Sequence, residues 1–261
     1  MKINELRIGI IHSLIGKNDG VSIVIDQTVK AMEKYLDINL GNFFFLAAHT
    51  SPRFNAVTDE VFWHKNDEHK FILRNFDNEN AEGLDELIHN HAMYAKSVIK
   101  KWGDENDIDL IIAHNTSHPY NFITAVGLGY YFEELRAEGI IWPKLMVWWH
   151  DSYFERKIFS NPNSVVKKYL KYLPGTYVDS IAFINNQQVE LGKKVFRQYN
   201  NPRLENFFKQ RTTVVPNTCD IPWEWEDLET NQEMHLAPPQ DNYNRSFLKD
   251  IGLEQEVKVR G

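Results

Sequence analysis

The chain alternates between short apolar segments and longer segments with helical periodicity. Residues 6–12 read LRIGIIH, an apolar run that ends at a histidine and is typical of a strand buried on both faces of a parallel sheet. Residues 21–35 then place Val21, Val24 and Val29 at helical spacing. A loop containing Gly16 and Gly20 separates these two segments. The sequence therefore predicts a first unit made of a strand, a glycine-containing loop and a helix.

The same alternation continues to about residue 215. Strands that alternate with helices form βαβ units, and such units build parallel sheets. We therefore predict an α/β fold with a Rossmann-like, doubly wound, mostly parallel sheet. Further strands are predicted at 42–48, 109–114, 144–149, 179–184 and 212–215, and further helices at 84–102, 122–137 and 187–199.

The pattern changes after the last predicted strand. Pro216 and Asn217 favour a turn there. The following segment, 222–244, is rich in acidic residues and contains two consecutive prolines, as expected of an extended linker. We predict one Rossmann-like domain over 1–217 and a linker or surface strap over 218–261.

Composition narrows the class of protein. With 261 residues and 43% hydrophobic content, the chain is long and apolar enough for a buried core. A net charge of -7 argues against a broad basic surface for nucleic acid. The single cysteine, Cys219, excludes an internal disulfide and fits a reducing compartment. The N-terminus lacks the features of a signal peptide and no segment approaches the length of a membrane span, so we expect a cytoplasmic protein. Residues 165–172 (VVKKYLKY) are basic and amphipathic but short, so they give little support to docking on a membrane surface.

Polar residues follow the predicted strands. Ligands of open parallel sheets bind at the carboxyl ends of the strands, so these residues are the first candidates for a site. Because the sheet is predicted to be mostly parallel, we expect these polar residues to converge on one edge. The candidates are His12 after the first strand, His114, Asn115 and His118 after the third, His150 and Asp151 after the fourth, and Asn185 after the fifth.

The loop before the first helix is a candidate phosphate site. Backbone N–H groups of Gly16, Gly20 and Val21 could approach a diphosphate at the N-terminus of the helix. The spacing is neither the dinucleotide fingerprint nor the P-loop. A plain turn explains the two glycines equally well.

His150 and Asp151 are the candidate catalytic pair. The imidazole could orient or activate a hydroxyl, and the carboxylate could hold a sugar hydroxyl or fix the histidine tautomer. The alternative is a capping pair for the next helix. A zinc site formed by these two residues with His114 and His118 is a further alternative, but the spacing matches no recognised zinc-protease motif. We therefore predict no metal and no other cofactor.

The two adjacent tryptophans and the polar run after the fifth strand each have two interpretations. Trp148 and Trp149 could stack on a sugar, but they lie inside a strand and core packing explains them at least as well. The run that begins at Asn185 could bind hydroxyl groups or simply begin a helix.

Several of these segments, in this order, resemble the N-terminal domain of retaining family-4 glycosyltransferases of the GT-B fold. The resemblance covers about residues 6–221, and its specificity comes from the order of the segments. They are RIGIIH with G-x-x-x-G-V-S at 16–22, DLIIAHN at 109–115, VWWHDS at 147–152, VDSIAFIN at 178–185 and TVVPNTCDI at 213–221.

The resemblance implies roles for particular residues. Residues 16–21 would approach the diphosphate of a nucleotide-sugar donor, and His150 would lie beside the transferred sugar and the acceptor. Asp151, Asn115 and His118 would line the acceptor pocket. The family binds its donor mainly through a second Rossmann-like domain with an E-x7-E element, and we expect no such domain in this sequence. Its E-x7-E match, Glu60 and Glu68, lies in the charged region before residue 70, where the family has no such element, and is interpreted as chance. A second polypeptide could supply such a domain.

The leading hypothesis is thus transfer of a hexose from a nucleotide sugar to a hydroxyl acceptor with retained anomeric configuration, by a chain that needs a second domain for activity. A non-catalytic binding or scaffold module with the same fold is the alternative. A metal-dependent hydrolase acting through His114, His118 and His150 is a third hypothesis.

Overall fold

The fold is that of a computed structural model, which describes residues 2–173, 177–197, 207 and 210–217. The chain divides into two units, Met1–Asn217 and Thr218–Gly261. The predicted linker at 218–261 lies outside the described residues and stays a prediction.

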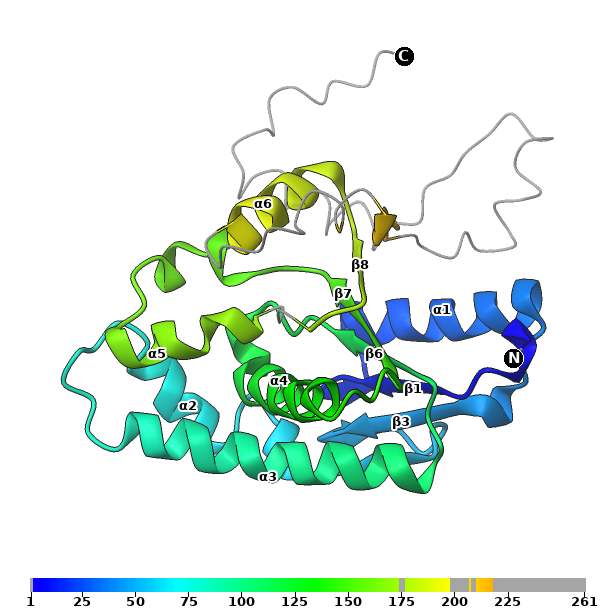
Figure 1. The fold of residues 1–261 in the computed structure, drawn as a ribbon, viewed down its shortest axis with the longest axis horizontal. Coiled ribbons are helices and arrows are strands. Elements are labelled where there is room, and N and C mark those ends of the chain that lie inside the picture. Colours follow the sequence, from blue (N-terminus) through cyan, green and yellow to red (C-terminus); the bar gives the residue numbers. More distant parts are fainter. Residues whose placement is uncertain (1, 174–176, 198–206, 208–209, 218–261) are drawn as a thin grey trace, which may run out of the picture. The chain divides into compact units, whose positions relative to one another are not determined.

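A seven-stranded parallel sheet forms the centre of the first unit (Figure 1). Its strand order is β5-β3-β1-β6-β7-β8-β9, and every neighbouring pair runs parallel. The strands are β1 (Ile8–Ile11), β3 (Phe43–Ala47), β5 (Ala56–Thr58), β6 (Leu110–His114), β7 (Lys144–Trp149), β8 (Ser180–Phe183) and β9 (Thr212–Val214). A separate parallel pair is formed by β2 (Leu14–Ile15) and β4 (His49–Thr50).

Helices cover both faces of the sheet, so the predicted Rossmann-like, doubly wound α/β fold is confirmed. One face packs against α1 and the other against α3 and α4, which lie side by side (Figure 1). The α-helices are α1 (Gly20–Leu36), α2 (Asp67–Arg74), α3 (Leu84–Glu105), α4 (Phe122–Ala137), α5 (Ser164–Tyr169) and α6 (Asn186–Arg197). The 3₁₀ turns are η1 (Ile3–Glu5), η2 (Leu40–Asn42), η3 (Glu60–Phe62), η4 (Pro119–Asn121), η5 (Tyr153–Glu155), η6 (Lys157–Phe159) and η7 (Leu170–Tyr172).

The apolar runs of the sequence fill two cores. Successive residues of a strand point to opposite faces, so Ile10 joins the core beneath α1 while Ile11 joins the core beneath α3 and α4. Ile112 and Ile111 divide between the faces in the same way. Continuous apolar strands are therefore needed here, because both faces are buried.

Small residues set the close approach of the helices on one face. A Cβ added to Gly9 in β1 would lie 2.4 Å from the ring of Trp102 on α3. A Cβ on Gly127 in α4 would lie 2.9 Å from that of Ala95 on α3. Both contacts are closer than packed carbon atoms tolerate, so these positions accept no side chain without a shift of the backbone.

The basic segment at 165–172 forms α5 and η7. Its apolar side chains Val166, Tyr169 and Tyr172 are buried in the core. Lys168 and Lys171 form ion pairs with Asp85 and Glu133. The apolar side of this segment therefore packs inside the protein.

Candidate functional site

The candidate residues meet where the sheet changes winding direction. The chain leaves β1 toward β3 on one side, and it leaves β6 toward β7 on the other. This point, between β1 and β6, is where open α/β sheets bind ligands. His12 follows β1 and His114 ends β6, and their ring centroids are 6.5 Å apart. The predicted convergence of these two residues is seen in the structure.

His114 and His150 contact each other directly. The Nδ1 atom of His114 lies 3.1 Å from the Nε2 atom of His150. The parallel register pairs His114 with Trp148, and the rings of these two residues stack with centroids 5.2 Å apart. The ring centroid of His150 lies 5.4 Å from that of His114 and 6.3 Å from that of Trp148, so the three rings form one cluster. Two strands thus bring together histidines that are distant in the sequence.

Burial keeps these histidines neutral at physiological pH. Desolvation lowers the pKa of His12 to about 4, although the nearby carboxylate of Asp19 opposes the shift. Desolvation, with a smaller contribution from His12, also lowers the pKa of His150 to about 4. The pKa of His114 is lowered well below 6.5, again chiefly by burial. The site therefore offers neutral imidazoles, which form hydrogen bonds but carry no positive charge.

The glycine loop leads into a capped helix. Gly16 has φ +67°, and a Cβ there would lie 2.5 Å from both Phe54 and Ser51, so this position requires glycine. Asp19 is the N-cap of α1, and its Oδ1 atom accepts hydrogen bonds from the amides of Val21 and Ser22. The plain-turn interpretation accounts for these contacts, and the role in diphosphate binding stays a prediction.

Asn115 organises the loop after β7. Its φ of 57° lies in the left-handed region, which asparagine tolerates better than most residues. Its Oδ1 atom accepts a hydrogen bond from the amide of Asp151 at 3.0 Å. In addition, the hydroxyl of Ser117 donates to the carbonyl of Asp151 at 2.6 Å. The turn after β6 therefore holds the backbone of Asp151 from both sides.

The Asp151 carboxylate faces two basic side chains. Arg156 donates through Nε to Oδ2 at 2.7 Å, and Nε2 of His118 lies 3.8 Å from the same oxygen. Because Nδ1 of His118 accepts the amide of Tyr120, its ring proton lies on Nε2 and points toward Asp151. Burial lowers the pKa of His118 to about 4 against the influence of Asp151. Ser152, not Asp151, is the N-cap of η5, so the capping-pair alternative is wrong for Asp151.

A carboxylate that the sequence analysis missed supports the same loop. Glu155 accepts hydrogen bonds from the indole N–H of Trp149 at 3.2 Å and from the hydroxyl of Ser152 at 2.8 Å. The side-chain amide of Gln188 donates both to Glu155 and to the carbonyl of His150. The sequence signal was only an acidic residue five positions after His150, which many surface positions share.

His64 and Tyr120 form a second group that sequence patterns did not reveal. Their rings stack at 5.5 Å with an angle of 8°, and Nδ1 of His64 lies 3.3 Å from the hydroxyl of Ser13. They place aromatic surface next to His118, whose ring is 4.5 Å from that of Tyr120.

The remaining predicted residues have structural roles. Asn185 accepts the amide of Gln188 through its side chain, so the interpretation as a helix start is confirmed. Trp148 and Trp149 are 5% and 0% exposed, as expected from the core-packing alternative. Contact of Asn185 with a substrate stays a prediction.

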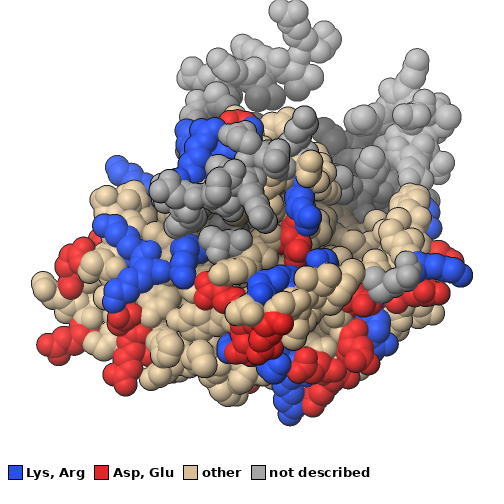
Figure 2. Space-filling model, in the orientation of Figure 1, with Lys and Arg blue, Asp and Glu red and all other residues tan. Residues whose placement is uncertain are grey.

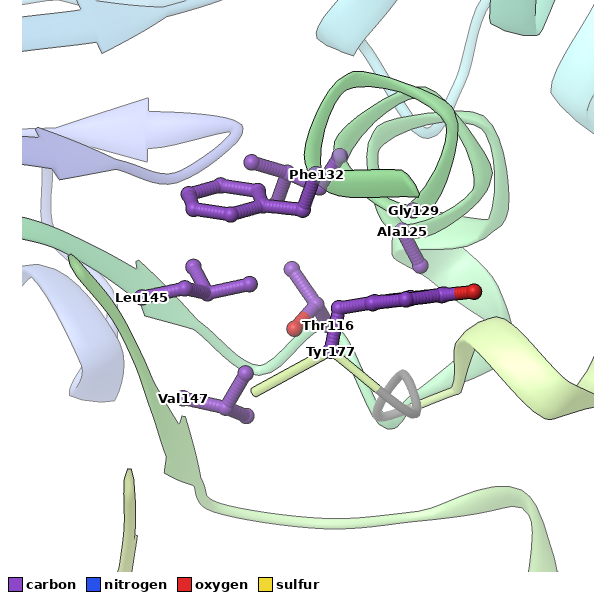
Figure 3. Close-up of a pocket in the computed structure, with 8 residues that line it drawn as sticks. Thr116, Ala125, Gly129, Phe132, Leu145, Val147 and Tyr177 are labelled. Carbon is purple, nitrogen blue, oxygen red and sulfur yellow. The ribbon is translucent and has the colours of Figure 1, made fainter. Parts of the chain in front are cut away.

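Hollows near these elements in the described part of the chain are lined by none of the predicted site residues. A small cavity of about 10 Å³ lies between α4 and β7, and Thr116 and Tyr177 are among its lining residues (Figure 3). This space is about the size of one water molecule. A groove of about 620 Å³ between α1 and β3 is lined by Asp26, Arg53 and Phe54 but by none of the candidate residues.

The distribution of charged side chains, the possible metal ligands and the apolar character of the helices bear on the class of protein. Acidic and basic side chains are interspersed over the face in view (Figure 2). Within the described ranges, no group of three or more His, Cys, Asp or Glu side chains is placed to hold a metal ion, so this arrangement gives no support to the metal-hydrolase alternative. No helix in the described part of the chain has the length and apolar character needed to cross a membrane.

Fold and site together define a Rossmann-like α/β protein with a histidine-rich site at the carboxyl edge of its sheet. No protein-family model matches the chain. The chain is 26% identical over 235 residues to the mannosylglucosylglycerate synthase of Petrotoga mobilis, a match that covers 85% of this chain and 48% of the relative. The chain thus spans about half the length of this curated relative. The relative is a glycosyltransferase, and the similarity supports a relationship to glycosyltransferases.

Proposed function

We propose that this chain is the acceptor-side part of a retaining GT-B glycosyltransferase of family 4, which transfers a hexose from a nucleotide sugar to a hydroxyl acceptor. The main support is the meeting of His12, His114 and His150 at the switch point of a parallel sheet. The distant similarity to a glycosyltransferase agrees with this reading.

In the proposed reaction, the bond between the anomeric carbon and the diphosphate breaks, and that carbon forms a bond to the acceptor oxygen. The nucleoside diphosphate leaves with the electron pair of the broken bond, and a phosphate oxygen of this leaving group takes the proton of the acceptor hydroxyl. The loop 16–20 approaches the diphosphate, while the amides of Val21 and Ser22 remain bonded to Asp19. His150 lies beside the transferred sugar and hydrogen-bonds it as a neutral imidazole.

The acceptor side is formed by Asn115, His118 and Asp151. Asn115 holds the backbone of Asp151, and His118 and Arg156 hold its carboxylate in one position. A fixed carboxylate oxygen suits a hydroxyl group, because it accepts a hydrogen bond without first having to be ordered. The exposed ring of Tyr120 adds apolar surface beside this group.

The proposal includes a second, nucleotide-binding domain, because clamping of the diphosphate supplies much of the catalysis in such transfers. The reading frame that follows Gly261 tests where this domain is encoded. A Rossmann-like segment with an E-x7-E element within about 200 residues would place it in the same polypeptide. Its absence would favour a separate polypeptide.

A transfer assay tests the activity itself. The chain, alone and together with its second domain, would be incubated with a panel of nucleoside-diphosphate hexoses, with mannose donors included because of the relative's name. Acceptors would include glucosylglycerate and simple sugars. We expect a glycoside whose anomeric configuration matches that of the donor. A stable chain that binds no nucleotide sugar and forms no glycoside in either setting would favour the binding-module alternative.

A matched pair of variants tests the role of His150. His150→Ala should reduce transfer by about a hundredfold or more, because it removes a group that acts on the reacting centre. His89→Ala, at an exposed position on α3, serves as the control and should leave transfer unchanged. Transfer by His150→Ala at the parental rate would show that the assigned role is wrong.

A further inference from the structure

His114 contacts His150 and is almost completely buried. It is 1% exposed, with the ring of Trp148 at 5.2 Å and that of His150 at 5.4 Å between centroids. A side chain with so little exposed surface does not reach a bound substrate unless the fold rearranges. Its polar contact among the described residues is with His150, at 3.1 Å between Nδ1 and Nε2.

The hydrogen bond between Nδ1 of His114 and Nε2 of His150 contains a single proton. Burial lowers the pKa of both histidines, that of His150 to about 4 and that of His114 well below 6.5. Both rings are therefore neutral near pH 7. A neutral imidazole has one N–H donor and one acceptor nitrogen, so one ring donates and the other accepts. The direction of donation determines which nitrogen of His150 carries its proton.

The second nitrogen of His114 distinguishes the two arrangements. Its Nε2 atom is buried and has no hydrogen-bond partner in the described part of the structure. If His150 donated, this Nε2 would carry a proton and would be a buried donor without an acceptor. If His114 donates from Nδ1, the same Nε2 is only an unused acceptor. Orphaned buried N–H groups are rarer than under-used acceptors, so the second arrangement is favoured.

We propose that His114 is a positioning residue, which donates its Nδ1–H to Nε2 of His150 and thereby holds His150 in the tautomer that carries its proton on Nδ1. His150 then presents an N–H donor to the reacting groups, not a lone pair. A donor at this place stabilises an oxygen that carries or gains negative charge, and it does not remove a proton from the acceptor hydroxyl. This consequence for transfer rests on the proposed function, whereas the tautomer is a property of the protein alone.

Nuclear magnetic resonance of the full chain with ¹⁵N-labelled histidine tests the tautomer directly. Two-bond correlations between ring carbon-bound protons and nitrogens distinguish protonated from unprotonated nitrogens. In the parental chain at pH 7, we expect protonated Nδ1 and unprotonated Nε2 for both His114 and His150. A protonated Nε2 on His150 would overturn the proposal without any variant.

Variants then test whether His114 causes this state. His114→Phe keeps a planar ring but removes the donor, so the Nδ1 signal of His150 should move toward the unprotonated range. His114→Asn restores an N–H at a similar place and should return the signal toward its original position. His69→Phe removes another buried histidine, on α2, and it should leave the signal of His150 unchanged. An unchanged His150 signal in a folded His114→Phe variant would refute the proposal.

A kinetic comparison connects the tautomer to transfer. His114→Phe should lower kcat by about a hundredfold with little change in KM, because the donor of His150 would then point away from the reacting groups. His114→Asn should recover part of kcat. If the chain transfers no sugar at all, the proposed function fails while the resonance result still decides the tautomer. If transfer occurs and His114→Phe is as active as the parent, the positioning role is wrong.

Discussion

Acid should destabilise this protein through one buried histidine, His69, to which the proposed reaction assigns no role. His69 on α2 is 0% exposed, and its Nδ1 atom lies 3.0 Å from the side-chain oxygen of Asn66. Its Nε2 atom is buried with no hydrogen-bond partner in the described residues. Burial, together with the proximity of His64 and His91, lowers the pKa of His69 to about 3. Protonation would place an uncompensated charge in the core.

The magnitude follows from the difference between the folded and unfolded pKa. The unfolded chain protonates this histidine below pH 6.5, whereas the folded chain keeps it neutral down to about pH 3. The stabilisation is therefore complete above pH 6.5 and is lost as the pH falls toward 3. Each pH unit in that window lowers the free energy of unfolding by about 1.4 kcal/mol. Lowering the pH from 7 to 5 should thus cost about 2 kcal/mol through His69 alone.

Urea unfolding at pH 7, 6 and 5 measures this effect when the parental chain is compared with His69→Phe. The variant keeps a ring of similar shape but cannot bind a proton. Its unfolding free energy should fall less steeply with acid, by about 2 kcal/mol over this range. The comparison concerns slopes, because loss of the bond to Asn66 also shifts the variant by about 1 kcal/mol at every pH.

His89→Phe is the control, since it removes an exposed histidine. The buried histidines of the site remain in all three proteins and contribute equally to their slopes. Parallel curves for the parental chain and His69→Phe would refute the reasoning. They would show that water or a rearrangement accommodates the charged ring.

Other predictions concern the loops that carry the site. Gly16→Ala should cost more than about 2 kcal/mol in urea unfolding, because φ is +67° and a Cβ would lie 2.5 Å from Phe54. Gly20→Ala is the control, because no atom lies within 4 Å of the added Cβ, and it should be neutral or stabilising by up to about 1 kcal/mol. A similar loss of unfolding free energy in both variants would contradict the steric explanation. Asn115→Gly should retain more unfolding free energy than Asn115→Ala, because only glycine fits φ 57° without strain, yet both should lose transfer with the bond to Asp151. Asn163→Ala should lower the free energy of unfolding by about 2 to 3 kcal/mol, because the buried side-chain amide donates to two backbone carbonyls. Thermal or urea unfolding measures this loss, and a value below about 0.5 kcal/mol would show that water replaces the amide.

The long elements could be predicted because their patterns repeat over enough residues. The helices predicted at 84–102 and 122–137 correspond to α3 and α4, and the strand predicted at 144–149 has the bounds of β7. The sequence pattern did not predict α2, α5 and β5, which have eight, six and three residues. Elements this short do not show a full hydrophobic period, and tertiary contacts stabilise them.

The candidate site could be predicted only in outline. Polar residues after apolar strands indicated one edge of the sheet, because all the strands run in the same direction. The support that Glu155 gives to the loop after β7 could not be inferred. It depends on Gln188 of α6, which is 33 positions further along the chain.

The sequence by itself therefore determined the α/β class, the alternation of strands and helices, and the edge at which polar residues gather. These properties follow from local periodicity and from strand direction. Only the tertiary structure determined that His114 contacts His150, because the parallel register places His114 opposite Trp148 across 34 residues of chain. It also determined that these rings are buried and neutral, since desolvation depends on the packing of β6 and β7 and not on the identity of the residues.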